Sequence, residues 1–193
     1  MKPISNKYIK NIPNALSISR FFFLPILGYL AYKNDRTTFG ILLIIYSLTD
    51  TLDGNIARYL KVTSEYGSKL DSLADDIGNL FMIPFTYLLF PSIFIDYKYL
   101  ISIVIALFIF IELLKILKAK NIDLHLYSGK LTLAILLFML IYMSFFKVSN
   151  ILLLTWSILA LYHLIESAIV LIFFKPDGKT KSVFDFIGRK DKR

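Results

Sequence analysis

Long apolar stretches separated by short polar segments occupy most of this 193-residue chain. A helix needs about 20 mostly apolar residues to cross a bilayer. We therefore predict an all-α fold, a bundle of six transmembrane helices at residues 15–32, 38–60, 68–90, 97–117, 131–146 and 151–174. The second and third stretches are the least hydrophobic because both carry aspartates, and hydropathy alone could reject them.

The two ends of the chain are more polar than the stretches between them. Residues 1–14 mix lysines with isolated apolar side chains and precede the first span, which is compatible with an interfacial helix or a disordered tail. Residues 175–193 are polar and basic and are interpreted as a mobile cytoplasmic tail. With no internal repeat, residues 1–193 are expected to form a single membrane domain.

Composition supports a membrane protein. The chain is 56% hydrophobic with only 19% charged residues, and its mean hydropathy is +0.64, unlike a typical soluble domain. The absence of cysteine excludes disulfides and thiolate metal sites. The net charge of +8 raises the question of nucleic-acid binding, but the basic residues flank apolar spans. Anionic lipid headgroups are the better partners, and no nucleic-acid partner is expected.

The basic residues also predict the orientation in the membrane. If the N-terminus is cytoplasmic, all but four of the 22 Lys and Arg residues fall on the cytoplasmic side. The exceptions are Lys33, Arg36, Lys98 and Lys147. Both termini and the loop between the second and third spans are therefore placed in the cytoplasm. Isoleucine- and lysine-rich usage is compatible with a microbial cytoplasmic membrane.

Four aspartates interrupt the second and third spans. Asp50 and Asp53 share one helical face, as do Asp71 and Asp75 on the next span, because residues three or four apart are neighbours on a helix. The two spans are antiparallel and joined by a short loop, so the acidic faces can meet. Each ionised carboxylate near a bilayer centre costs roughly 2.5–3.5 kcal/mol, so the cluster requires cations.

The cations near this cluster in the sequence are Arg58 and Lys69, too few to neutralise four acids. Carboxylate ligands without cysteine select hard cations, so we expect Mg²⁺ or Mn²⁺, with Ca²⁺ as an alternative. Two such ions suit displacement at phosphorus, and the planar Arg58 side chain suits phosphate oxygens. The chemistry indicated is transfer of a phosphoryl-bearing group between a nucleotide and an alcohol near the cytoplasmic face.

Two other functions would also place acids in a membrane. A divalent-cation transporter or channel is the alternative of a different class, but it would distribute acids along a path and does not explain Arg58 or the regularly spaced glycines. A catalytically inactive scaffold is a further alternative, which the presence of all four aspartates disfavours.

The spacing resembles the signature of the CDP-alcohol phosphotransferase family, D-x2-D-G-x2-A-R-x8-G-x3-D-x3-D. The chain matches its eight fixed positions over 26 residues, from Asp50-Thr-Leu-Asp53-Gly54-Asn-Ile-Ala57-Arg58 to Gly67-Ser-Lys-Leu-Asp71-Ser-Leu-Ala-Asp75. The resemblance implies a six-helix membrane enzyme, usually a homodimer. Such an enzyme transfers a phosphatidyl-type group from a CDP-linked lipid, such as CDP-diacylglycerol, to a small alcohol or lipid alcohol, and releases CMP.

The resemblance also implies residue roles. Asp50, Asp53 and Asp71 would ligate two metal ions, and Asp75 would approach the metals and act as the general base. The positions that would contact the CDP-linked lipid are Asn14, Ser17, Gly54, Arg58, Ser64 and Gly67.

The acceptor alcohol is left open. Asp76 puts a negative charge where a phosphate-binding cation is expected, which disfavours a phosphorylated acceptor. By contrast, residues 11–20 and the pair Gly129-Lys130 resemble the phosphatidylglycerophosphate synthases of the family. Asp76 and Lys130 are therefore the candidate acceptor-binding residues, and Lys130 is equally explained as a cytoplasmic membrane anchor.

Overall fold

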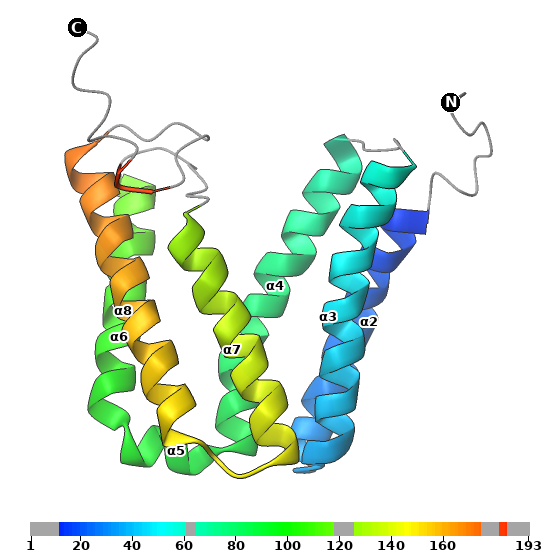
Figure 1. The fold of residues 1–193 in the computed structure, drawn as a ribbon, viewed down its shortest axis with the longest axis horizontal. Coiled ribbons are helices and arrows are strands. Elements are labelled where there is room, and N and C mark those ends of the chain that lie inside the picture. Colours follow the sequence, from blue (N-terminus) through cyan, green and yellow to red (C-terminus); the bar gives the residue numbers. More distant parts are fainter. Residues whose placement is uncertain (1–11, 61–64, 118–125, 175–181, 185–193) are drawn as a thin grey trace, which may run out of the picture. The chain divides into compact units, whose positions relative to one another are not determined.

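The computed structural model describes residues 12–60, 65–117, 126–174 and 182–184, and within them it contains helices and no strand (Figure 1). The helices are α2 (Ile12–Tyr32), α3 (Arg36–Tyr59), α4 (Glu65–Leu89), α5 (Pro91–Asp96), α6 (Lys98–Leu117), α7 (Tyr127–Phe145) and α8 (Asn150–Phe173). The all-α prediction is confirmed, and each long helix begins and ends within four residues of its predicted span. The short helix α5, which begins at a proline, was not predicted.

Within the described residues, four helices are long and apolar enough to cross a membrane: α2 over Asn14–Tyr32, α6, α7 and α8. Helices α3 and α4 have 24 and 25 residues, but they do not combine the hydropathy and low charge of the other four. Both carry the motif aspartates, which lower their hydropathy. The six-span count therefore stays a prediction. The interfacial helix proposed for residues 1–14 falls mostly outside the described residues.

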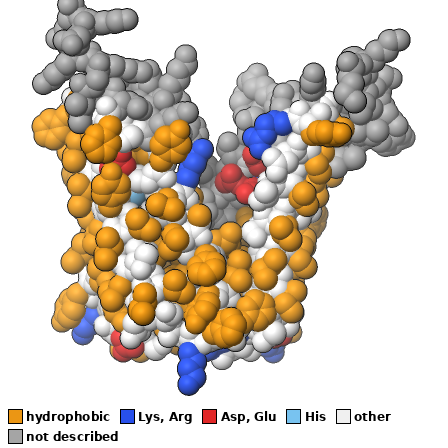
Figure 2. Space-filling model, viewed as in Figure 1, with side chains coloured by type: hydrophobic (Ala, Val, Ile, Leu, Met, Phe, Trp, Pro, Cys, Tyr) orange, Lys and Arg blue, Asp and Glu red, His pale blue; other side chains and the backbone are white. Residues whose placement is uncertain are grey.

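Hydrophobic side chains cover much of the visible surface in the space-filling view (Figure 2). Leu117 of α6, for example, is 78% exposed. Large exposed apolar areas are unusual on soluble monomers, whereas contact with lipid tails accounts for them in a membrane protein.

The chain divides into two compact units, each described by itself. Unit 1 contains Met1–Pro91 and Ser144–Lys147, and unit 2 contains Ser92–Met143 and Val148–Arg193. In unit 1, α2 packs against both α3 and α4. Their core includes Phe39 and Phe85, whose rings meet edge to face with centroids 5.8 Å apart.

The turn between α2 and α3 explains why these helices lie side by side. Asn34 adopts a positive φ of 56°, a conformation that asparagine tolerates better than most residues and that ends helices. The next residue, Asp35, caps α3 by accepting a hydrogen bond from the backbone N–H of Thr38 at 3.1 Å. Two adjacent residues thus reverse the chain and start the helix that carries Asp50 and Asp53.

In unit 2, α6 packs against α8 through Ile111, Leu164 and Leu171. The segment 182–184 also lies in this unit, and it contacts Glu166 of α8. The buried Glu166 carboxylate accepts hydrogen bonds from the Ser182 hydroxyl and the Val183 backbone N–H, both at 3.0 Å. This part of the predicted mobile tail is therefore hydrogen-bonded to a helix.

Candidate metal centre

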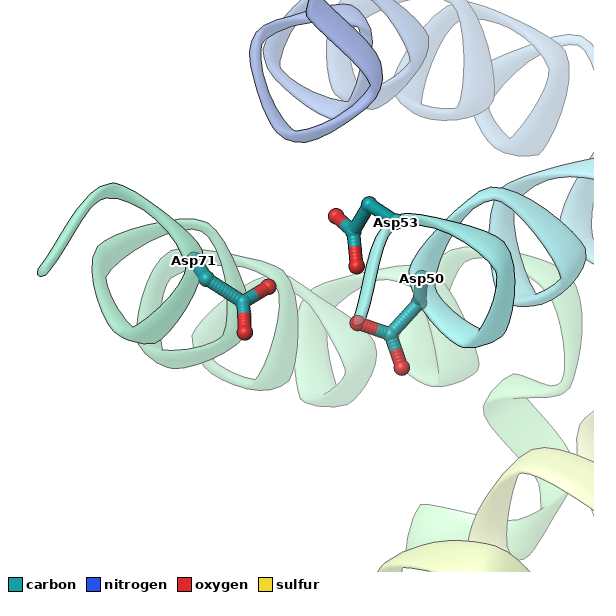
Figure 3. A group of neighbouring side chains, drawn as sticks. All are labelled: Asp50, Asp53 and Asp71. Atoms are coloured by element: carbon teal, nitrogen blue, oxygen red, sulfur yellow. The ribbon is translucent and has the colours of Figure 1, made fainter. Parts of the chain in front are cut away.

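Three of the four motif aspartates converge between α3 and α4. One carboxylate oxygen from each of Asp50, Asp53 and Asp71 lies within 4.8 Å of the other two, and Figure 3 shows the three side chains turned toward one another. The convergence follows from helical periodicity, because Asp50 and Asp53 are three residues apart on α3. The predicted meeting of the two acidic faces is present in the structure.

The environments of these carboxylates differ. The Asp53 side chain is 3% exposed, whereas Asp50, Asp71 and Asp75 are 45%, 40% and 47% exposed. The centre therefore has one buried side and one side that a substrate can approach.

Arg20 of α2 lies among all four aspartates. Its Nη1 donates to Asp50 Oδ1 at 2.5 Å and to Asp75 Oδ1, and its Nη2 donates to Asp53 Oδ2 at 3.1 Å and to Asp71 Oδ1. The Arg20 side chain is 1% exposed. The expectation that only Arg58 and Lys69 lie near the acids is wrong, because α2 packs on both acidic helices and brings a third cation between them.

Ser17 stands one turn before Arg20 on α2. Its hydroxyl donates a 2.8 Å hydrogen bond to Asp53 Oδ2, the same oxygen that Arg20 contacts. Ser17 was predicted to bind the CDP-linked lipid, and the structure places it at the acidic centre. The Ser17–Arg20 spacing of three residues, on one helical face, is the sequence signal that could have indicated both residues.

The Tyr46 side chain of α3 lies against Gly78 of α4 beside the centre. A Cβ atom built on Gly78 would lie 2.0 Å from the Tyr46 hydroxyl, so any other residue here would force the tyrosine ring or a helix to shift. Tyr46 is one turn before Asp50, and Gly78 is one turn after Asp75. Glycine thus leaves room for the Tyr46 hydroxyl against α4, one turn from the aspartates.

Four other predicted site residues are described, and each lies on a different helix. Arg58 is exposed, and its Nη2 donates to Asn55 Oδ1 at 2.9 Å; among the described residues it makes no ion pair with the aspartates. Gly67 is half-buried in the first turn of α4, and Asn14 is half-buried near the start of α2. Lys130 is exposed on α7 in unit 2.

The structure does not describe the surroundings of three predicted site residues. Gly54 and Asp76 lie on α3 and α4, but their surroundings are not described, and Ser64 lies outside the described residues.

The donor set fits a hard divalent cation. The converging atoms are all carboxylate oxygens, the ligands that Mg²⁺ and Mn²⁺ prefer. A guanidinium group already lies against all four carboxylates, which shows that the site attracts positive charge. One guanidinium neutralises one of the four negative charges and leaves a formal balance of −3. The remaining negative charge is therefore sufficient to bind divalent cations.

The helices and the acidic centre together define an integral membrane protein with a candidate site for divalent cations. A sequence model of the CDP-alcohol phosphatidyltransferase family matches residues 10–171. The chain belongs to this family, as the motif predicts.

Curated relatives share parts of the chain. It is 40% identical over 93 residues to human "Cardiolipin synthase (CMP-forming)", covering 40% of this chain and 30% of the relative. It is 35% identical over 72 residues to "CDP-diacylglycerol--glycerol-3-phosphate 3-phosphatidyltransferase" of Rickettsia typhi, covering 36% of this chain and 40% of the relative. The matched segments thus span less than half of the length of these relatives. No solved structure matches the chain significantly.

Proposed function

We propose that the protein transfers a phosphatidyl-type group from a CDP-linked lipid, CDP-diacylglycerol first, to an alcohol and releases CMP. The observation that carries this proposal is the convergence of Asp50, Asp53 and Asp71 in a chain of this family. The two relatives support it, since one is named for forming CMP and the other for acting on CDP-diacylglycerol and glycerol 3-phosphate.

The proposed roles follow from where the side chains lie. Asp50, Asp53 and Asp71, with Asp75 beside them, would hold two Mg²⁺ or Mn²⁺ ions. Such ions, when bound, would stabilise the negative charge of the donor pyrophosphate and of the departing CMP. Ser17 orients the buried Asp53 by donating to its carboxylate.

Asp75 is the proposed general base. Its carboxylate shares Arg20 Nη1 with Asp50 and is 47% exposed, so an acceptor hydroxyl can reach it. Asp75 would take the hydroxyl proton as the oxygen attacks the phosphorus atom attached to the lipid, while the bond from that phosphorus to the CMP oxygen breaks. Arg58, exposed at the end of α3, and Gly54, Ser64, Gly67 and Asn14 are proposed to contact the donor.

Two candidate residues favour different classes of acceptor alcohol, neutral and phosphorylated. Asp76 argues for the first and Lys130 for the second. The relative named for glycerol 3-phosphate makes that alcohol the first to test, with phosphatidylglycerol, serine, inositol and inositol phosphate beside it. We also propose a homodimer in a microbial cytoplasmic membrane, with the centre near the cytoplasmic face.

The test is CMP release by purified protein from CDP-diacylglycerol with Mg²⁺ or Mn²⁺ and each acceptor. Asp75→Asn should abolish release without unfolding the protein. Asp35→Asn is the matched control, because asparagine also caps helices and Asp35 lies in the turn that precedes α3. Normal turnover by Asp75→Asn would remove Asp75 as the base. Release of no CMP with any acceptor would refute the proposed activity, and Mn²⁺ uptake into vesicles would favour a transporter.

A further inference from the structure

Arg20 links all four aspartates as well as offsetting part of their charge. Its guanidinium contacts one oxygen of each aspartate: Oδ1 of Asp50, Asp71 and Asp75, and Oδ2 of Asp53. These contacts come from a single side chain on α2 and reach both acidic helices. Arg20 thus joins three helices at one point, which is the point where a metal ion would be held.

A metal ion and this guanidinium would compete for the same atoms. Mg²⁺ binds oxygen at about 2.0–2.1 Å, so an ion shared by oxygens within 4.8 Å of one another must lie among them. The Arg20 nitrogens already lie 2.5 Å from an Asp50 oxygen and 3.1 Å from an Asp53 oxygen. Both groups are cationic, and each would repel the other at such separations.

The guanidinium is also incompletely hydrogen-bonded where it lies. Nη1 and Nη2 donate to all four carboxylates, but Nε is buried and has no hydrogen-bond partner among the described residues. A buried donor without a partner costs free energy. The guanidinium is therefore held at this position by its four ion pairs, whose carboxylate oxygens a divalent ion would take over.

We propose that Arg20 is a built-in counter-cation of the metal centre: it holds the four aspartates together when divalent cations are absent and leaves their oxygens when Mg²⁺ or Mn²⁺ binds. This inference rests on the proposed function only in taking the aspartates as metal ligands. Arg20 is in this sense a positioning residue, since it acts on the carboxylates and not on the substrate.

The test measures metal binding without substrate. Mn²⁺ is titrated into purified protein and followed by electron paramagnetic resonance, comparing wild type with Arg20→Gln. Removing the competing cation should tighten Mn²⁺ binding at least ~10-fold, because the binding-competent state no longer requires its displacement. The matched control is Arg36→Gln, the same loss of charge in unit 1 near the start of α3, which should bind Mn²⁺ as wild type does.

A stability measurement separates this role from a simple structural ion pair. In chelator, Arg20→Gln should unfold at a lower temperature than wild type because four carboxylates then repel one another without a cation. Added Mn²⁺ should raise its unfolding temperature by more than it raises that of wild type. Folding of this variant in Mn²⁺ alone would equally support the proposal.

Arg20→Lys keeps the charge but lacks the planar fork, so it should bind Mn²⁺ more tightly than wild type and less tightly than Arg20→Gln. If Arg20→Gln binds Mn²⁺ no better than wild type, the proposal is overturned. If Arg20→Gln folds neither in chelator nor in Mn²⁺, the test passes to Arg20→Lys. Mn²⁺ binding by Arg20→Lys that is no tighter than that of wild type then overturns the proposal as well. None of these results depends on CMP release, so failure of the proposed activity is recognised separately.

Discussion

Substitution of Gly78 by alanine tests how closely the Tyr46 side chain of α3 approaches α4. The added Cβ would lie 2.0 Å from the Tyr46 hydroxyl oxygen and 3.2 Å from the ring carbon that bears it. An ordinary contact is longer than 3 Å, so the ring or a helix has to move by more than 1 Å. Overpacking of this kind costs about 1–3 kcal/mol. Because the overlap exceeds 1 Å, the upper part of that range, about 2–3 kcal/mol, applies. Alanine returns about 1 kcal/mol in helix propensity, so we expect a net destabilisation of about 1–2 kcal/mol.

A double variant isolates the cause. Tyr46→Phe removes the hydroxyl and leaves the ring carbon at 3.2 Å, a contact that a shift of a few tenths of an ångström relieves. Gly78→Ala with Tyr46→Phe should therefore recover most of the lost stability. Gly28→Ala is the matched control, because its Cβ would lie 3.3 Å from the nearest Phe85 atom and needs only a small adjustment.

The assay is thermal unfolding of the purified protein in detergent, followed by intrinsic fluorescence. One kcal/mol corresponds to about 2–4 °C for a domain of this size. Gly78→Ala should unfold several degrees below wild type, and Mn²⁺ binding should weaken with it, since Asp50 and Asp75 lie one turn away. A Gly78→Ala protein as stable as wild type, or a double variant no more stable than Gly78→Ala, would refute the close approach.

Three further substitutions have defined outcomes. Ser17→Ala removes the hydrogen bond to the buried Asp53 carboxylate, and we expect a loss of about 1–3 kcal/mol in unfolding experiments in chelator, with Ser17→Thr closer to wild type. Asp71→Asn should weaken Mn²⁺ binding at least ~10-fold in a titration while the protein stays folded, because a charged ligand becomes neutral; unchanged affinity would exclude Asp71 as a ligand. Glu166→Ala should release the segment around Val183, seen as faster C-terminal cleavage in limited proteolysis than in wild type. Glu166→Gln keeps an acceptor oxygen, so its cleavage should be slower than that of the alanine variant. Equal cleavage of wild type and the alanine variant would contradict the anchoring.

Helical periodicity and apolar length were sufficient to predict the six long helices and the meeting of Asp50 and Asp53 with Asp71. These features depend on residues that are neighbours on one helix or on consecutive helices. Arg20 could not be found in the same way, because it contacts partners 30 to 55 residues away along the chain. The three-residue spacing of Ser17 and Arg20 indicates a shared polar face of α2, and the packing of α2 on both acidic helices shows what that face contacts. The contact between Tyr46 and Gly78 is likewise a property of helix packing, since neither residue stands out by type.

Closeness in sequence to the aspartates did not indicate which basic residue contacts them. Arg58 lies on the same helix as Asp50 and Asp53, yet its guanidinium is exposed and bonded to Asn55. Its position five residues after Asp53 places it more than a turn further along α3. Arg20, which the orientation rule counts only as a cytoplasmic charge, is the cation that the carboxylates contact.

The place of Arg20 in the chain has a consequence for how the protein is made. Residues 12–32, which carry the guanidinium, leave the ribosome before any of the four aspartates. Each aspartate entering the bilayer by itself would cost roughly 2.5–3.5 kcal/mol. A positive partner already present in the first helix can offset part of that cost as each acidic helix arrives. The order of synthesis therefore delivers the counter-charge first, and α3 and α4, if they span the bilayer as predicted, would be inserted beside a helix that already carries it.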